Sequence, residues 1–361
     1  MPLAGNKLLP DPDELELTLI GPGYGESVVL HLGGGRWMIV DSCLGDWSGT
    51  PSALRYLTSL GVDPVAGVVL IVATHWHDDH IRGLANLVSS CPSADFVMSG
   101  ALQTREFSRL VEAWRGSLME SSGLDEFGRI LQEVCLRKQQ IRYAGPDRCL
   151  YREANVEIHS LSPSDRAIEK AKVALSQLWP GAMDQKRRIA SIRPNETSVA
   201  LWIQAGEDCI LLGADLEESG DPLAGWSAIV ASVTRPTGKA NLFKVPHHGS
   251  ENGHHDSVWT QLLHPSPISA LTPFSNGDVL LPTKQDVSRI CSLSCAAYIT
   301  APPQRRSALK RLPKSVQKTL REMGKDVLEV PVATGLVRAR KRPSAGAWAI
   351  SLEGTAHQLP A

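Results

Sequence analysis

Aromatic residues and long apolar runs are scarce in this chain, and each scarcity excludes a class of protein. Phe, Trp and Tyr make up 5% of the sequence. They are nearly absent from its basic C-terminal region, so stacking of bases on aromatic rings has little support there. No uninterrupted apolar run is long enough to span a membrane, and the opening residues contain no basic segment followed by an apolar core. We therefore expect a cytoplasmic protein without a membrane segment.

Cysteine is also sparse and follows no ligand pattern. The 7 cysteines are an odd number with no zinc-finger spacing. Several, such as Cys209 and Cys291, lie in apolar segments, so we expect buried thiols and no disulfides. With no internal repeat, and with 42% hydrophobic residues among 361, the chain is long and apolar enough for one large core with additions.

The formal charge of −1 conceals an uneven distribution of charge. Residues 305–342 hold twelve Lys or Arg and three Asp or Glu, a net charge of +9. Residues 335–354 are predicted to form two strands joined by a turn, and the alternation of Arg338 and Arg340 with apolar residues would make one face cationic. Such a face could bind nucleic acid through phosphates, but a merely solvated face is about equally expected.

The strongest chemical signal is the segment HWHDDH at residues 75–80. Residues 66–74 before it are a continuous apolar, β-rich run, which predicts a buried strand leading into the segment. Side chains two apart on an extended chain point the same way, so His75 and His77 can bind one metal ion.

A helix is expected next, from Asp79 to Val88, because its apolar residues recur at helical spacing. Asp79 and His80 would lie in its first turn, where they can reach a second metal ion and where Asp79 complements the helix dipole. The alternative is a polar loop that happens to be rich in histidine. Four ligand-type residues at this spacing favour a binuclear metal site.

This segment resembles the signature of the metallo-β-lactamase-fold hydrolases, His-x-His-x-Asp-His after a core strand. Residues 209–215 (CILLGAD) extend the resemblance, since they read as a buried strand ending in Asp215, and in this family that carboxylate bridges the two metals. Residues 241–250 (NLFKVPHHGS) supply the last histidine and are similar to the soluble domain of ComEC-type DNA-uptake proteins and related phosphodiesterases. Residues 15–32 are similar to that group's opening strand, glycine turn and second strand. The signature positions are met by His75, His77, Asp79 and His80.

Of the neighbouring histidines His247 and His248, one should bind metal, because adjacent side chains in an extended segment point apart. We favour His248, together with Asp79, His80 and Asp215, as the ligands of the second metal. His247 would then face the substrate as a hydrogen-bond donor or proton carrier, or it would simply pack beneath the loop.

The first metal has a weaker predicted ligand set. The resemblance implies a third histidine about twenty residues before Asp215, and here Asn195 occupies that place. An amide oxygen is a poor zinc ligand, so the metal at His75 and His77 should bind more weakly or take an additional water. Zinc is expected at both positions, with manganese as the alternative.

Two metals held close together lower the pKa of a bridging water to roughly 7, which supplies hydroxide as the nucleophile. Asp79, Asp215 and His247 are the predicted catalytic residues. Lys244, Asn195 and Ser250 are predicted to contact the substrate, with Lys244 directing a cation at a phosphate. Lys186, Arg187, Arg188 and Arg193 lie on a loop before Asn195, although each alone is most often a solvated charge.

The expected architecture is an α+β, four-layer αββα sandwich with two mostly antiparallel sheets and the metals at one edge. Residues 1–303 would form the catalytic domain, including a two-helix insertion at 101–143. Residues 304–361 would form a basic helix and β-hairpin extension that is packed on this domain or tethered to it. The insertion is a candidate lid or docking hairpin, though ordinary outer packing is slightly favoured. Its apolar helix positions are Phe107, Leu110, Val111, Trp114 and Leu118, then Leu124, Phe127, Ile130, Leu131 and Val134.

The resemblance implies a phosphodiesterase or nuclease, with a phosphodiester substrate such as DNA or another nucleic acid. A small-molecule hydrolase of the same fold, acting on a phosphocholine ester, cyclic nucleotide, thioester or lactam, would share every ligand. A third hypothesis is a metal-stabilised interaction module with vestigial catalysis, binding a protein partner through 101–143 or 304–361.

Overall fold

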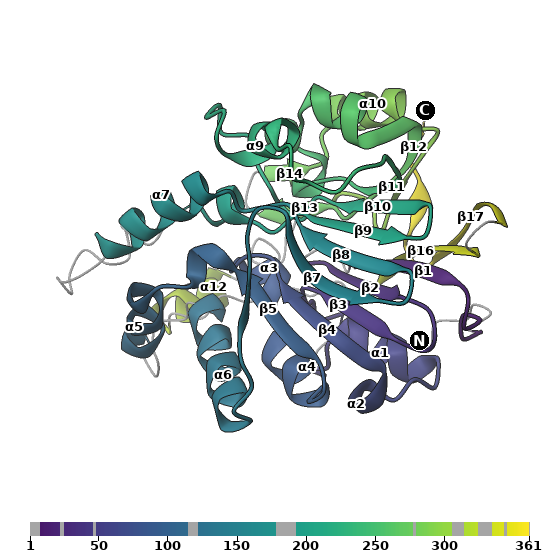
Figure 1. The fold of residues 1–361 in the computed structure, drawn as a ribbon. Helices are drawn as coiled ribbons and strands as arrows, with labels where there is room; N and C mark the ends of the chain where they lie inside the picture. The colour runs from purple at the N-terminus through teal and green to yellow at the C-terminus, as the bar shows by residue number, and fades with distance from the viewer. Residues whose placement is uncertain are drawn as a thin grey trace.

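Two eight-stranded sheets face each other, and helices cover both outer faces (Figure 1). The expected αββα sandwich is therefore confirmed. The computed structural model describes residues 8–21, 25–45, 48–114, 122–177, 193–276, 279–304, 314–323, 334–342 and 345–360.

The first sheet contains the early strands of the chain and a hairpin from its end. Its spatial order is β17 (Ala345–Glu353), β16 (Gly335–Arg342), β1 (Leu15–Gly21), β2 (Ser27–His31), β3 (Trp37–Val40), β4 (Val68–Ala73), β5 (Asp95–Ser99) and β6 (Arg142–Ala144).

The second sheet contains the middle of the chain, and a small two-stranded sheet, β13 (Phe274–Asn276) with β14 (Val279–Leu281), stands apart from it. The spatial order of the second eight-stranded sheet is β18 (His357–Gln358), β15 (Ala296–Ile299), β12 (Leu263–Leu271), β11 (Ala240–Lys244), β10 (Asp208–Leu212), β9 (Leu201–Ala205), β8 (Val156–Ser160) and β7 (Arg148–Glu153).

Both sheets are mixed, with four antiparallel and three parallel pairs in each, so the expected antiparallel majority is present but small. Strands β3 to β6 run parallel to one another, as do β10, β11, β12 and β15. Parallel neighbours need a crossover connection, and helices supply several of these connections. The carboxyl ends of the parallel strands β10 and β11 share one edge of the second sheet. Contacts between the residues after them and those after β4 place the end of β4 beside them in the facing sheet.

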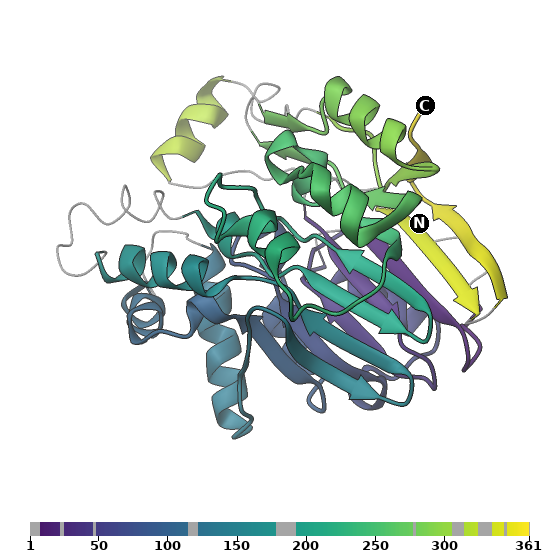
Figure 2. The ribbon, with the colours of Figure 1, turned by 45° about the horizontal axis from the view of Figure 1, so that its top comes forward.

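Helices form the two outer layers (Figures 1 and 2). Those outside the first sheet are α1 (Ser52–Ser59), α2 (Pro64–Gly67), α4 (Leu84–Ser90), α5 (Arg105–Trp114) and α6 (Ser122–Leu136), and those outside the second are α9 (Gly225–Ala231), η5 (Val258–Leu262) and α10 (Lys284–Leu293). The remaining helices are α3 (Asp78–Ile81), η1 (Gly100–Leu102), α7 (Asp165–Ser176), η2 (Pro194–Thr197), η3 (His247–Gly249), η4 (Glu251–Gly253) and α12 (Lys314–Glu322).

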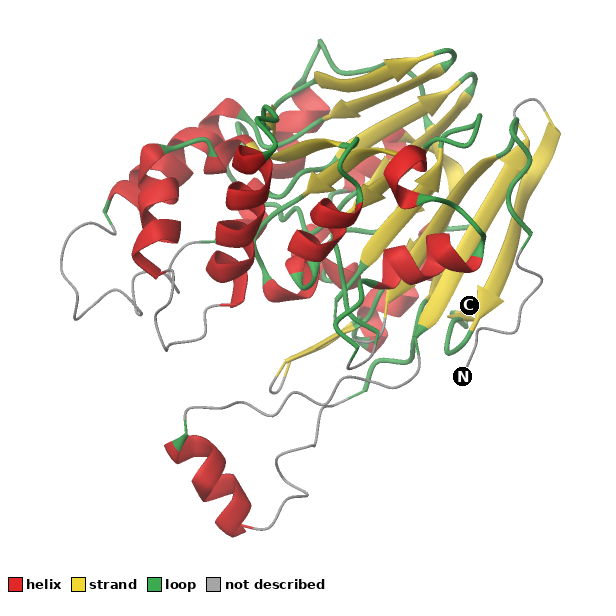
Figure 3. Cartoon of the chain, turned by 90° about the horizontal axis from the view of Figure 1, so that it is seen from below, coloured by secondary structure: helices red, strands yellow, loops and turns green. Residues whose placement is uncertain are grey.

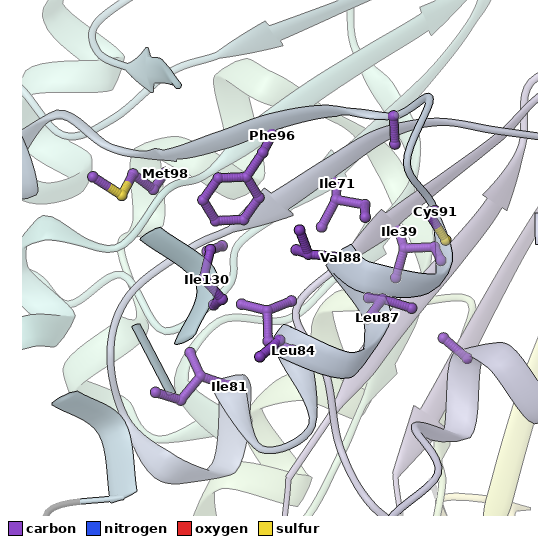
Figure 4. Packing of buried hydrophobic residues seen from close by; sticks show 14 of the residues in the cluster. Ile39, Ile71, Ile81, Leu84, Leu87, Val88, Cys91, Phe96, Met98 and Ile130 are labelled. Carbon is purple, nitrogen blue, oxygen red and sulfur yellow. The ribbon is translucent and has the colours of Figure 1, made fainter. Parts of the chain in front are cut away.

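The apolar run before residues 75–80, the metal segment, is continuous because β4 is covered on both faces. Leu70 and Val72 belong to the core between the sheets, whereas Ile71 and Ala73 belong to the core beneath the helices. Figure 4 shows Ile71 next to Val88 of α4, in the same cluster as Leu84 and Leu87. A strand buried on both faces loses the alternation of apolar and polar residues.

The helix expected from Asp79 to Val88 is broken in two. α3 ends at Ile81 and α4 begins at Leu84, with Gly83 between them at φ 81°. A Cβ on Gly83 would lie 2.8 Å from Cδ2 of Leu44, so the position favours glycine for both conformation and space. The break leaves Asp79 and His80 in a single turn next to β4.

The two predicted helices of the insertion are present as α5 and α6, although Leu118 lies outside the described residues. Their buried side chains join the core outside the first sheet, as expected for ordinary packing. The Phe107 ring also meets Trp76 of the metal segment edge-on, with ring centroids 6.0 Å apart. The buried residues are Phe107, Val111, Leu124, Phe127, Ile130 and Val134.

The C-terminal hairpin belongs to the first sheet of the sandwich. β16 pairs with β1 and β18 pairs with β15, so both sheets depend on these residues. Figure 2 shows the yellow hairpin beside the purple N-terminal strands, while α12 stands away from the sheets in Figure 3. Among the described residues, no helix is both long and apolar enough to cross a membrane.

The cationic face predicted on this hairpin is neutralised within the fold. Arg338 is 4% exposed. Its Nε donates to the Tyr56 hydroxyl at 2.9 Å and its Nη2 to Glu353 at 2.8 Å. Nε of Arg340 donates to Oε2 of the buried Glu16 at 2.5 Å. These arginines therefore stabilise the hairpin and do not form a free phosphate-binding surface.

Candidate metal centre

Three strand ends bring the predicted ligands together at one edge of the sandwich. β4 leads into the metal segment, β10 into Asp215, and β11 into His248. His75, Asp79, His80, Asp215 and His248 are all buried, and His77 is partly exposed. Loops that follow neighbouring parallel strands share one edge, so residues distant in sequence can form one site.

Four side chains form the first group, which corresponds to the predicted second metal. Nε2 of His80 lies 3.3 Å from Oδ1 of Asp215. Nε2 of His248 lies 3.3 Å from Oδ2 of Asp79 and 3.4 Å from Oδ2 of Asp215. One ligand atom from each of the four lies within 4.8 Å of the others. Such a cluster can hold a single cation.

A second group of three side chains lies beside it and shares Asp215. Nε2 of His75 is 3.2 Å from Nδ1 of His77 and 3.9 Å from Oδ2 of Asp215. One ligand atom from each of His75, His77 and Asp215 lies within 4.8 Å of the others. Asp215 can therefore contact ions in both groups, as the resemblance implied for a bridging carboxylate.

Unpartnered polar atoms show that these residues fit a metal. Nε2 of His80, Nε2 of His248 and Oδ1 of Asp215 are buried, and none has a hydrogen-bond partner. Buried polar atoms are nearly always satisfied, so three orphaned atoms aimed at one centre indicate a missing ligand, such as an ion. Imidazole with carboxylate is a ligand set that suits zinc.

Asp41 and Thr74 support the ligands from behind. Oδ2 of Asp41 lies 2.7 Å from Nδ1 of His80, while the Thr74 amide and hydroxyl both donate to Asp41 at 2.7 Å. The Thr74 hydroxyl is also 2.9 Å from Nδ1 of His75. Such partners fix the tautomer and orientation of ligating histidines.

His247 lies beside the metal groups without joining them. Its Nε2 is 3.2 Å from Nδ2 of Asn195, and its Nδ1 is 3.4 Å from Oε1 of Glu217. Asn195 in turn donates to Glu217 at 2.9 Å. Nδ2 of Asn195 therefore faces His247 and Glu217.

The extended conformation predicted for His247 and His248 is wrong. Both residues lie in η3 with positive φ, 47° and 52°. Their rings nevertheless point to different surroundings, because this turn rotates the chain between them. His248 joins the metal group, its ring stacked on Phe274 at a centroid distance of 5.1 Å.

Burial and charge shift the pKa values of the cluster in opposite directions. Burial lowers the pKa of His75, and the neighbouring His80 and His77 lower it further. Burial also opposes the charged form of His248, but the carboxylates of Asp215 and Asp79 outweigh it and raise the pKa to about 9. The pKa of His80 is raised for the same reason. In metal-free protein, protonated His80 and His248 thus balance the negative charge of the carboxylates.

The structure corrects the role predicted for Lys244. Its side chain is 1% exposed, and Nζ lies 2.5 Å from Oε1 of Glu26 behind the cluster, so it cannot direct a charge at a bound phosphate. The Ser250 hydroxyl accepts from the amide of Asn252 and caps η4. Arg193 pairs with Glu196 at the surface. Lys186, Arg187 and Arg188 lie outside the described residues.

The supporting residues that escaped prediction from the sequence include Glu26, Asp41, Glu217 and Thr272. Asp41 directly follows β3, a parallel neighbour of β4, and this position was a usable signal. The other three act through contacts between segments far apart in the chain, such as the hydrogen bond from Thr272 to Glu26. No local pattern identifies such partners.

Comparisons with known proteins find one family model and several solved structures that are similar to this chain. Residues 20–111 match the family model described as Metallo-beta-lactamase superfamily. The chain is similar to the metallo-beta-lactamase fold protein YhfI from Bacillus subtilis, at 14% identity over 81% of this chain and 96% of that chain, with a TM-score of 0.42. It is also similar to MEM-A1, a subclass B3 metallo-beta-lactamase from a soil metagenome library, at 13% identity over 66% and 82% of the chains, with a TM-score of 0.35. A search of curated protein sequences finds no match.

Proposed function

We propose that this protein is a hydrolase that uses two divalent metal ions and acts on a phosphodiester. The observation that carries the proposal is the convergence of two adjacent ligand groups on the shared Asp215, with three ligand atoms buried and unpartnered. Zinc suits the imidazole and carboxylate ligands, and manganese is the alternative because two carboxylates take part.

Two divalent ions in such a site activate water at neutral pH and neutralise charge on the substrate. The residues of the chain position these ions and the substrate. Asp215 belongs to both ligand groups and links them, and Asp79 and His248 belong to one of the two. His247 has 16% of its side chain exposed beside the cluster, so it can hydrogen-bond a substrate oxygen or carry a proton. No serine or cysteine nucleophile is required.

The phosphodiester class is supported by the resemblance of residues 241–250 to ComEC-type proteins. A small-molecule substrate is the second candidate, and one observation favours it. Arg338 and Arg340, the predicted nucleic-acid contacts, are paired with buried carboxylates or the Tyr56 hydroxyl. A polymer would therefore need other cationic contacts.

The test is turnover by purified protein reconstituted with zinc or with manganese. Bis-p-nitrophenyl phosphate, plasmid DNA, a phosphocholine ester and a chromogenic lactam are compared at equal enzyme concentration. We expect hydrolysis of the phosphodiester that is lost in Asp79→Ala. Hydrolysis of small esters but never of DNA would sink the nuclease hypothesis, and a fully metal-loaded protein inert on all four substrates would favour the interaction module.

A further inference from the structure

A buried ion pair lies directly behind the metal cluster and takes no part in the chemistry proposed above. Nζ of Lys244 is 2.5 Å from Oε1 of Glu26, with side-chain exposures of 1% and 3%. Lys244 ends β11 of the second sheet, and Glu26 precedes β2 of the first. Burying two charges is costly, so such a pair is weak evidence for stability and invites another explanation.

Lys244 holds the turn that directs Asp215 into the cluster. Its Nζ donates to the carbonyl oxygen of Ala214 at 2.8 Å, and that oxygen also accepts from the amide of His247 at 3.0 Å. Ala214 has φ 43°, a left-handed conformation that is unfavourable for a residue with a Cβ. The two hydrogen bonds keep this residue, and hence Asp215 after it, in place.

Glu26 supports two other ligands through its second oxygen and its backbone. Oε2 accepts from the Thr272 hydroxyl at 2.5 Å, and that hydroxyl lies 3.1 Å from Nδ1 of His248. A hydroxyl that donates to Glu26 is left to accept from Nδ1–H of His248, which directs the lone pair of Nε2 at the cluster. The Glu26 amide also donates to the carbonyl oxygen of Asp79 at 2.9 Å.

We propose that Glu26, Lys244 and Thr272 are positioning residues for the metal bound by Asp79, His80, Asp215 and His248. The inference rests on the proposed metal binding and deepens it. The paired side chains act on Asp215 and His248, and the Glu26 amide holds Asp79, so these two residues from facing sheets couple the docking of the sheets to the geometry of the site. Lys244 neutralises Glu26, which lets that carboxylate orient Thr272 without adding an uncompensated charge.

Lys244→Met distinguishes positioning from simple electrostatics, because the two predict opposite changes in metal affinity. A cation near the metal repels it, so loss of the charge alone would tighten metal binding. Loss of positioning weakens it, by roughly 10–100-fold for partners behind a ligand. Because Lys244→Met leaves Glu26 buried and unpaired, the neutral double variant E26Q/K244M keeps the test valid if the single variant folds poorly.

Thr272→Val and Thr272→Ser form a matched pair at the other end of the network. Valine keeps the shape of threonine and removes the hydroxyl, whereas serine keeps the hydroxyl. Lys341→Met is the control for loss of a lysine pair, since Lys341 contacts Asp208 at 2.5 Å, at the end of β10 away from Asp215.

The measurement is the affinity for each equivalent of zinc, by competition with a chromogenic chelator, together with the melting temperature of metal-free protein. We expect one equivalent to weaken in E26Q/K244M and Thr272→Val, with near-parental affinity in Thr272→Ser and Lys341→Met. Parental affinity in both E26Q/K244M and Thr272→Val, or tighter binding in Lys244→Met, would overturn this inference alone. A parent protein that binds no metal would overturn the proposed function as well.

Discussion

Oδ2 of Asp41 lies 2.7 Å from Nδ1 of His80, and both side chains are buried. Asp41 also accepts two hydrogen bonds from Thr74, so its orientation is fixed. Asp41→Asn should weaken metal binding by roughly 10–100-fold, because a neutral amide holds the tautomer of His80 less strongly. Chelator competition measures this loss. Asp286→Asn, in a buried helix cap, is the control, and equal affinity in Asp41→Asn and parent would contradict the assignment.

Metal stoichiometry should separate the two ligand groups. His77 belongs to one group and His248 to the other, while Asp215 belongs to both. His77→Ala and His248→Ala should each retain about one equivalent, and Asp215→Ala should retain least, since ligand loss removes one coordination position per site. Elemental analysis after gel filtration gives the counts. His264→Ala, at an exposed histidine on β12, should match the parent, and two equivalents in Asp215→Ala would argue against a shared carboxylate.

His247→Gln should lower turnover while both metals stay bound. Its ring contacts Asn195 and Glu217 and not the metal group, so the loss concerns substrate contact or proton transfer, which contribute about 100-fold or more. Steady-state kinetics and metal content are measured together. His255→Gln changes a partly buried histidine in the adjacent loop, near Ser227, and should leave both unchanged. Loss of metal in His247→Gln would return this residue to the ligand set.

Arg338 should contribute strongly to stability. It is paired with Glu353 and Tyr56 in a buried setting, and removing one partner leaves the others uncompensated. We expect Arg338→Met to lower the free energy of unfolding by about 3–5 kcal/mol, measured by urea denaturation. Arg342 pairs with Asp11 at the surface on the same strand, so Arg342→Met should have little effect. Equal effects would mean that burial of the pair is unimportant.

Stability of the metal-free protein should fall at alkaline pH. The pKa of His248 is raised from 6.5 to about 9, since burial lowers it but Asp215 and Asp79 outweigh burial. A raised pKa stabilises the fold fully below the unfolded value, and this stabilisation is lost as pH rises through the folded value. Because a metal replaces the proton, the gain in melting temperature on adding metal should grow from about pH 7 to about pH 9. A constant gain, or the same growth in His248→Gln, would contradict this explanation.

The ligand groups could be predicted because their geometry is mostly local. His75 and His77 follow one strand, Asp79 and His80 share the next turn, and Asp215 ends a recognisable strand. The partners of Lys244 could not be predicted in this way. Glu26 and Thr272 are 246 residues apart, and only the packing of the two sheets brings them together. From the sequence alone, a lysine near a histidine pair therefore predicts a phosphate contact.

The charge of the C-terminal hairpin was misjudged for a related reason. Composition counts Arg338 and Arg340 as free cations, but Glu16 and Glu353 neutralise them after the strands pair. The prediction of one continuous helix from Asp79 to Val88 was wrong for a different reason. The apolar spacing is helical, but Gly83 in a left-handed conformation interrupts the helix. Periodicity predicts which face is buried, whereas a single glycine can decide where the chain turns.

Pairing of β1 with β16 also constrains how the protein can be made. Leu15 is opposite Lys341 in the register of this pair, so one edge of β1 has no neighbour during most of synthesis. A chain emerging from the ribosome must protect that edge, and the buried carboxylate of Glu16, until the last strands appear. Such distant closure favours slow folding and gives chaperones a defined segment to shield.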